Sequence, residues 1–262
     1  KKFGASFLYD VSNSLTAKIG LNHENQNALF DYQYQNLGNS FKNVSTTVSL
    51  KFSPNDKNMM TPGGKLTYEK KFPQFFLNYE FGSKIFDGEL NYHRLDALAI
   101  HQFRSKLGTT TLKFLGGISS GTAPIWKNFE ITGQTNGSSE NWTSKINTPS
   151  TLGFVTMPSG TFYADKFVSL QVSQYLPFRF KTIGKTYSTL ELEYKSAVGN
   201  FKNPENHQFN FQVLNHNYQE VGLVWNRFLG RKFDVGFSYR LGYYQTSQFK
   251  DNFGLQIRLS GF

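Results

Sequence analysis

Charged side chains recur at alternate positions in two segments near the end of the chain. Glu191, Glu193 and Lys195 follow one another at a spacing of two, and Asp234 and Arg240 share one parity in a later segment. Residues at this spacing lie on the same face of a β-strand, so each segment presents its charges together. Two interpretations stay open. The charges form a cluster that docks a loop or lines a solute path, or they pair with one another and fill a polar interior.

The remaining polar residues give no specific indication of catalysis. The chain has five histidines and no cysteine, so a thiolate metal site or a disulfide framework is ruled out. None of the histidines has the HExxH spacing of a zinc protease, and no Ser, His and Asp set stands out. We therefore expect no catalytic residue, no metal, no cofactor and no enzymatic activity. A hydrolase with a histidine–carboxylate pair at the rim of the fold is a third-ranked alternative.

The charged segments belong to strands that have one apolar face. Between Phe233 and Tyr243 the odd positions are aromatic or aliphatic and the even positions are charged or small. A period of two over this length predicts a strand that is longer than most strands of soluble sheets. It is long enough to cross a bilayer at a tilt. An aromatic face opposite charges and glycines is typical of a wall between lipid and a polar lumen.

The last segment of the chain is expected to close this wall. Its apolar positions are Phe253, Leu255, Ile257, Leu259 and Phe262. The final phenylalanine is out of step with the other four, and a bulge at residues 260–261 would restore its register.

Composition agrees with alternating strands. The chain has 262 residues, of which 38% are hydrophobic and 17% aromatic, yet its mean hydropathy is only -0.46. No run approaches the roughly 18 apolar residues of a membrane helix. Alternating strands can show apolar residues to lipid without raising the average. A soluble all-β sandwich is the competing fold, and the length of the alternating runs argues against it.

The formal charge of +10 does not indicate a nucleic-acid partner. The basic residues are scattered, without a basic helix, a zinc pattern or an aromatic–basic RNA motif. Basic residues at a barrel rim would meet anionic lipid headgroups and the phosphates of lipopolysaccharide. A solvated surface explains the same scatter. We expect outer-membrane lipid and lipopolysaccharide as partners and no nucleic acid.

The order of segments predicts about fourteen strands, nine before a long irregular stretch and five after it. The nine are residues 3–9, 15–22, 29–35, 44–52, 65–72, 75–81, 85–92, 95–103 and 109–115. The irregular stretch, residues 122–161, contains Trp126, Phe129 and Trp142. Loops of this length in compact domains are usually functional or disordered, and its aromatic residues favour packing. We expect this loop to fold into the lumen of an antiparallel outer-membrane β-barrel.

This order of strands and loop resembles the outer-membrane assembly-factor barrels, the surface-antigen superfamily. The segments FVTMPSGTFYADKFVSLQVSQYL, YQEVGLVWNRFLG, VGFSYRLGYYQ and FKDNFGLQIRLSGF are more specific. They resemble a large uncharacterised Gram-negative family in which a carboxypeptidase-regulatory-like domain precedes such a barrel. The resemblance covers residues 106–262 in sequence and the first hundred residues in pattern.

The resemblance implies that residues 1–262 are the C-terminal barrel of a longer chain. Sixteen strands are expected, two of them upstream together with a periplasmic domain and an export signal. Assembly factors carry an Arg-Gly dipeptide at the tip of the lumenal loop, whereas residues 122–161 contain no arginine and offer Lys127 and Lys145 as long cations. The first functional hypothesis is a non-enzymatic barrel in outer-membrane biogenesis, or a subunit of an outer-membrane complex with protein partners. The second is a transport barrel gated by this loop.

Overall fold

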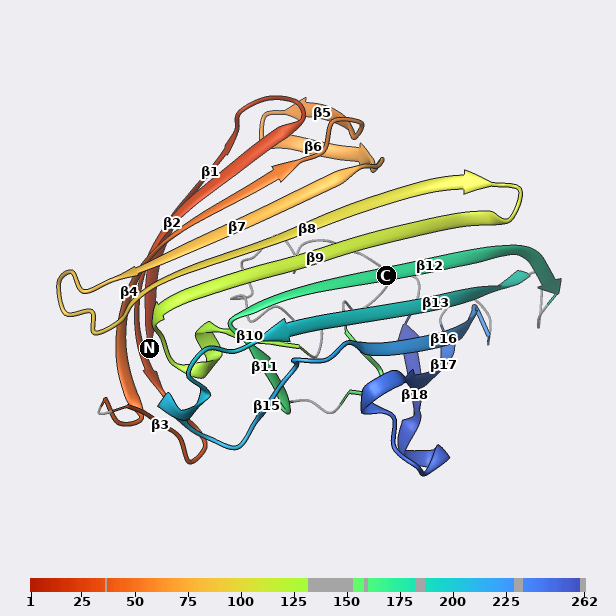
Figure 1. Cartoon of the computed structure of the whole chain (residues 1–262). Coiled ribbons are helices and arrows are strands. Elements are labelled where there is room, and N and C mark those ends of the chain that lie inside the picture. Colours follow the sequence, from red (N-terminus) through yellow and green to blue (C-terminus); the bar gives the residue numbers. More distant parts are fainter. Residues whose placement is uncertain (36, 132–152, 158–159, 182–186, 229–232, 260–262) are drawn as a thin grey trace.

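The computed structural model describes residues 1–35, 37–131, 153–157, 160–181, 187–228 and 233–259 (Figure 1). These residues form an all-β structure built on one antiparallel sheet of eleven strands. In the described ranges, no helix has the length and apolar character required to span a membrane.

The large sheet follows the order of the chain, because every strand pairs with the next one along it. Its strands, in spatial order, are β1 (Lys2–Asp10), β2 (Leu15–Asn27), β4 (Ser40–Phe52), β7 (Gln74–Ser83), β8 (Asn91–Ser105), β9 (Gly108–Thr122), β12 (Lys166–Lys181), β13 (Tyr187–Asn200), β16 (Tyr218–Asn226), β17 (Phe233–Leu241) and β18 (Phe253–Leu259). Figure 1 shows them as one strongly curved layer. Within the described ranges β1 and β18 each have one neighbour, so the sheet is not closed there.

The expected number of strands was too high for the large sheet. Five strands follow the long irregular stretch, as predicted, but six rather than nine precede it in the large sheet. Residues 29–35 contribute only β3 (Gln33–Tyr34), which pairs with β14 (His207–Gln208). Residues 65–72 overlap β6 (Gly64–Glu69), which pairs with β5 (Lys57–Thr61) in a separate hairpin. Most of residues 85–92 are a loop. Local alternation indicates a strand but not the neighbour with which it pairs, which explains the first two errors. In residues 85–92 the short alternation belongs mostly to a loop.

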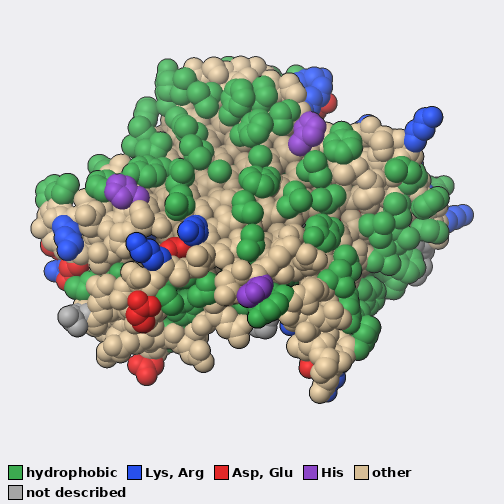
Figure 2. Space-filling view, in the orientation of Figure 1, with side chains coloured by type: hydrophobic (Ala, Val, Ile, Leu, Met, Phe, Trp, Pro, Cys, Tyr) green, Lys and Arg blue, Asp and Glu red, His purple; other side chains and the backbone are tan. Residues whose placement is uncertain are grey.

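The two faces of the large sheet carry opposite chemistry, and the apolar face is the exposed one. Residues directly opposed across antiparallel strands share a face. One such row runs through Leu192, Leu223, Phe237 and Leu255, whose exposed fractions are 46%, 41%, 45% and 58%. Figure 2 shows hydrophobic side chains across the visible face. We call this the outer face.

The opposite face, here the inner face, is polar and buried. Adjacent to the apolar row on the same strands, Glu193 and Ser238 are 5% and 2% exposed. Charged residues of β8, β9, β13 and β16 are also buried on this side: Arg94, Asp96, Lys113, Lys195 and Glu220. A soluble sheet buries its apolar face instead, so this arrangement is inverted.

Segments of the chain itself cover the inner face, within the curve of the sheet (Figure 1). The 3-10 turn η1 (Ile125–Lys127) leads into β10 (Phe129–Glu130), which pairs with β11 (Phe162–Ala164), and β11 pairs in turn with β15 (Gln212–Val213). We call the described residues between β9 and β12, namely 123–131, 153–157 and 160–165, the plug. Buried apolar residues join it to the wall: Phe129, Phe154, Phe162, Ala197, Leu214 and Tyr218 belong to one cluster.

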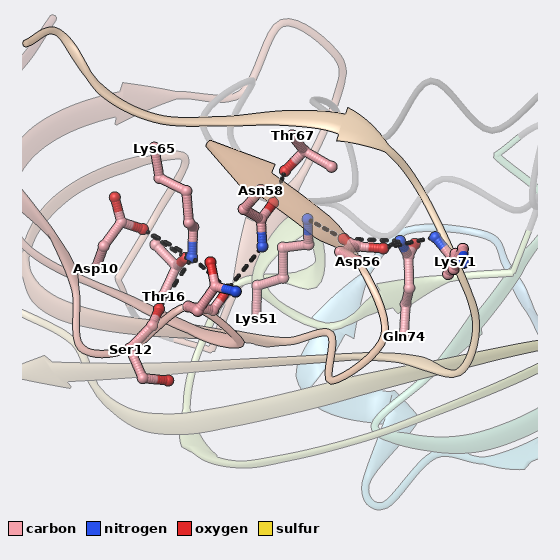
Figure 3. A network of polar contacts seen from close by, with 11 residues as sticks. Asp10, Ser12, Thr16, Lys51, Asp56, Asn58, Lys65, Thr67, Lys71 and Gln74 are labelled. Carbon is pink, nitrogen blue, oxygen red and sulfur yellow. Dashed lines mark hydrogen bonds and ion pairs between the residues drawn. The ribbon is translucent and has the colours of Figure 1, made fainter. Parts of the chain in front are cut away.

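The two ends of the sheet differ in their connections. At one end, β1–β2 and β8–β9 are joined by tight turns; at the other, the connections between strands are longer in sequence, namely residues 28–39, 84–90, 123–165 and 201–217. We call these the short-turn end and the long-loop end. The β5–β6 hairpin lies at the short-turn end (Figure 3), where the Lys65 ammonium contacts Asp10 at 3.1 Å and Thr16 at 2.7 Å. Asp56 accepts hydrogen bonds from Gln74 and from the Lys71 amide.

Candidate functional site

The plug is attached to the wall by buried charges, and the first attachment is Lys127 at the end of η1. Its ammonium lies 2.8 Å from Glu80 on β7 and 3.4 Å from Glu24 on β2. The ammonium also lies 5.5 Å from the centre of the Tyr92 ring, on β8. Burial opposes the charge on Lys127, but Glu80, Tyr92 and Glu24 outweigh it and hold its pKa above the ordinary value. Lys127 is therefore a charged group that joins one plug segment to three strands.

The aromatic residues expected to pack the loop do so where the structure describes them. The Trp126 indole donates to Gln26 at 2.6 Å and its ring lies 5.3 Å from that of Phe41. Phe129 is fully buried, with the Arg94 guanidinium 4.6 Å from its ring centre. Trp126 and Phe129 thus both contact residues of the wall. Trp142 and Lys145 lie outside the described residues.

The second attachment is at Thr156, which three wall residues hold. The Glu220 carboxylate on β16 accepts from the Thr156 amide and hydroxyl, each at 2.8 Å, and from the Val155 amide at 3.1 Å. The Tyr218 hydroxyl lies 2.9 Å from the Thr156 hydroxyl. Arg240 on β17 donates to the Thr156 carbonyl oxygen. One carboxylate that accepts three hydrogen bonds from adjacent residues fixes the backbone of this plug segment.

The five charged residues singled out from the sequence all belong to β13 and β17, but they do not act alike. Lys195 donates to the Gly153 carbonyl of the plug at 2.8 Å and lies 3.6 Å from Glu193 and 3.7 Å from Glu220. Together with Arg240, it therefore contacts the plug directly. Glu191 accepts from the Asn226 amide group at 3.4 Å, and Asp234 accepts from the backbone of Arg227 at 2.7 Å, so their described contacts are within the wall.

The strand expected to close the wall is present as β18, paired with β17. The backbone register places Phe253, Leu255, Ile257 and Leu259 on the face that carries Phe237, and the side chains of the first two are exposed there. Phe262 and the expected bulge at residues 260–261 lie outside the described residues.

Three attachment carboxylates were not among the predicted site residues: Glu24, Glu80 and Glu220. Each is a carboxylate at an inner-face position of a strand, where its register partner is also polar. Their positions on the polar face of each strand could have identified them, from the sequence, as buried charges. Their partners are contributed by a loop, so the sequence offered no way to pair them.

The histidine–carboxylate pair that a rim hydrolase needs is present once in the described ranges. The His23 imidazole lies 2.8 Å from the Asp87 carboxylate at the long-loop end, and both are exposed. Within those ranges no serine hydroxyl is hydrogen-bonded to this histidine. The hydrogen bond from His23, followed by Lys42 nearby, lowers the pKa of Asp87. An exposed pair of this kind is a surface ion pair when no nucleophile completes it.

Ser119 lies in a Gly-x-Ser-x-Gly sequence, residues 117–121, of the type found at the nucleophile of α/β-hydrolases. That motif acts at a sharp turn between a strand and a helix, with the serine exposed. Here it lies inside β9, and Ser119 is buried. The hydroxyl contacts Asn128 at 2.6 Å and donates to the Asp165 carbonyl at 3.1 Å. The environment is that of a structural residue that holds the plug.

A protein-family model matches part of the chain. Residues 6–118, from within β1 to within β9, match the C-terminal domain of a family of unknown function, DUF5686. No curated protein matches the chain. The match includes Glu24 and Glu80 but not the plug, and the sequence segments with the more specific resemblance begin at Phe154, beyond it. Over less than half of its length, the chain is therefore similar to the C-terminal domain of a family whose function is unknown.

Proposed function

We propose that this chain is the wall of a Gram-negative outer-membrane β-barrel whose interior is occupied by its own plug. The inverted chemistry of the sheet supports this. An exposed apolar face on eleven successive strands would be unstable in water, whereas lipid on one side and a polar interior on the other suit both faces.

The placement of aromatic residues on the outer face agrees with this proposal. Near the short-turn end, exposed aromatics occupy outer-face positions on six strands: Tyr9, Phe52, Phe75, Phe103, Trp225 and Phe233. Phe3 and Phe253 lie towards the long-loop end, and Leu77 and Leu223 lie between the two levels. Membrane barrels have aromatic girdles at both interfaces, short periplasmic turns and longer extracellular loops. In the proposed orientation, the short-turn end faces the periplasm.

The function that we infer is non-enzymatic: a role in outer-membrane biogenesis, or as a subunit of an outer-membrane complex. One observation carries this choice. Buried or half-buried charges on β2, β7, β13, β16 and β17 hold the plug at two separate places. Breaking a buried ion pair by removing one partner is strongly destabilising, so a plug held in this way is stationary. The surfaces left for interaction are then the outer face and the two ends.

Depletion of the full-length protein in its native cell tests the proposal. We expect many unrelated outer-membrane barrels to decrease together in quantitative proteomics of the outer membrane if the chain serves assembly. A decrease confined to a few proteins that co-purify with it would indicate the complex-subunit form. If the other outer-membrane proteins keep their levels, biogenesis is the wrong class.

A gated transport barrel is the second candidate, favoured by the polar character of the inner face. It requires the plug to move. Planar-bilayer recordings can compare the natural protein with a Lys127→Met, Glu220→Gln variant, which weakens both attachments. A gated pore predicts new conductance steps in the variant, and a variant as silent as the natural protein would speak against transport.

A further inference from the structure

The loop between β7 and β8, residues 84–90, carries two exposed apolar side chains at the long-loop end. Ile85 is 56% exposed and Phe86 is 93% exposed. The backbone of Phe86 has φ = 60°, the left-handed region that bulky residues disfavour. Water contact with a phenylalanine ring and a strained backbone both cost free energy. These two costs indicate that the exposed Phe86 side chain has a function.

The loop is held against the outer face of the wall. The Asp87 carboxylate contacts the His23 imidazole at 2.8 Å and the Lys42 ammonium at 3.5 Å. The Lys42 amide donates to the Glu89 carboxylate at 2.9 Å, and the Glu89 amide donates back to the Lys42 carbonyl at 2.8 Å. His23 on β2 lies on the outer face, because it is directly opposite Phe3 and Val44. Lys42 lies on the same face, because it is two residues from Val44 on β4. Four contacts therefore fix the loop on the apolar side.

Gly88 allows this close approach. A Cβ atom at this position would lie 2.4 Å from the Ser83 carbonyl oxygen and 3.4 Å from the Cβ of Val44, which is on the outer face. Only glycine can occupy such a position without a shift of the backbone. Figure 1 shows the loop between β7 and β8 projecting beyond the edge of the sheet.

From this geometry we propose that the β7–β8 loop is a membrane-interface anchor that inserts Ile85 and Phe86 into the boundary between lipid headgroups and acyl chains. The inference rests on the proposed lipid-facing wall and adds a lipid contact made by a loop rather than a strand. Continuity with the outer face selects lipid as the partner, because the loop lies directly against that face. The neighbouring cations Lys42 and Lys84 suit the phosphates of the headgroups.

The chain contains no cysteine, so a single introduced thiol can be labelled without background. The full chain is reconstituted in vesicles of phosphatidylcholine and phosphatidylglycerol with an environment-sensitive NBD label at one position. Phe86→Cys tests the anchor. Leu223→Cys, on the outer face of β16, gives the reference signal for a label among the acyl chains. Leu29 is 99% exposed on the neighbouring loop, so Leu29→Cys gives the reference signal for a label in water. Spin-labelled lipids with shallow or deep nitroxides then give the depth of each label.

We expect the label at position 86 to emit at shorter wavelength than the label at position 29. A shallow nitroxide should quench it more strongly than a deep one, and the reverse should hold at position 223. Adding Asp87→Ala to Phe86→Cys should move the signal towards that of position 29, because it removes the contacts to His23 and Lys42.

If position 86 behaves like position 29 while position 223 is buried in lipid, the anchor is refuted and the wall proposal stands. The same holds if a protein partner, and not lipid, shields position 86. If position 223 also reports water, the lipid-facing wall fails, and the anchor fails with it.

Discussion

The attachment of the plug through Lys127 can be tested by its effect on stability. Replacing lysine with methionine keeps most of the length and volume of the side chain but removes its charge. Glu80 and Glu24, 2.8 Å and 3.4 Å from the ammonium, are then left as a half-buried and a buried carboxylate without this cation. Loss of one partner of a buried ion pair costs about 3–5 kcal/mol. We expect Lys127→Met to lower the free energy of unfolding by roughly this amount.

The triple variant Lys127→Met, Glu24→Gln, Glu80→Gln separates charge from packing. It removes all three charges, so most of the lost stability should return, to within about 2 kcal/mol of the natural protein. Urea unfolding of the protein in lipid vesicles, followed by tryptophan fluorescence, measures both variants. Lys57→Met is the control, because Lys57 pairs with Glu69 on an exposed hairpin, and we expect little change there.

The reasoning fails if Lys127→Met unfolds at the same urea concentration as the natural protein. It fails in a different way if the triple variant is as unstable as the single one. In that case the stability depends on the shape and hydrogen bonding of these side chains and not on compensation of buried charge.

Three further outcomes are expected. Gly117→Ala should lower the free energy of unfolding in urea by about 1–3 kcal/mol, because its Cβ would lie 2.5 Å from the Phe129 ring. Gly116→Ala, on the open outer face, is the matched control. Equal losses in the two variants would contradict the assigned faces. Burial lowers the pKa of His207 from 6.5 to about 4, so stability should be full above pH 6.5, fall by roughly 3 kcal/mol between pH 6.5 and about 4, and level off below. His207→Gln should flatten that dependence, and an unchanged pH slope would assign it to other groups. Leu223→Arg should destabilise the lipid-embedded protein by about 2–4 kcal/mol, and tolerance of the arginine in vesicles would argue against a lipid-facing position.

The sequence alone determined the strands and the chemistry of their faces. Alternation from Phe233 to Tyr243 predicted β17, which ends two residues earlier at Leu241. The same pattern predicted β13, β16 and β18, because the side-chain period of two depends on local backbone geometry. It also predicted that Trp126 and Phe129 would pack and that five strands follow the loop. The charges of Lys195 and Arg240 were placed on the polar face for the same local reason.

Tertiary structure alone decided which strands share a sheet and which charges meet. Residues 65–72 were predicted as a wall strand, yet those that form a strand, up to Glu69, pair with β5 in a separate hairpin, since pairing depends on the turn that precedes a strand. Glu80 and Lys127 are 47 residues apart in the chain and 2.8 Å apart in space. Ion pairs and hydrogen bonds between a loop and a wall leave no periodic trace in sequence. The path of the loop across the inner face therefore determines the attachments of the plug.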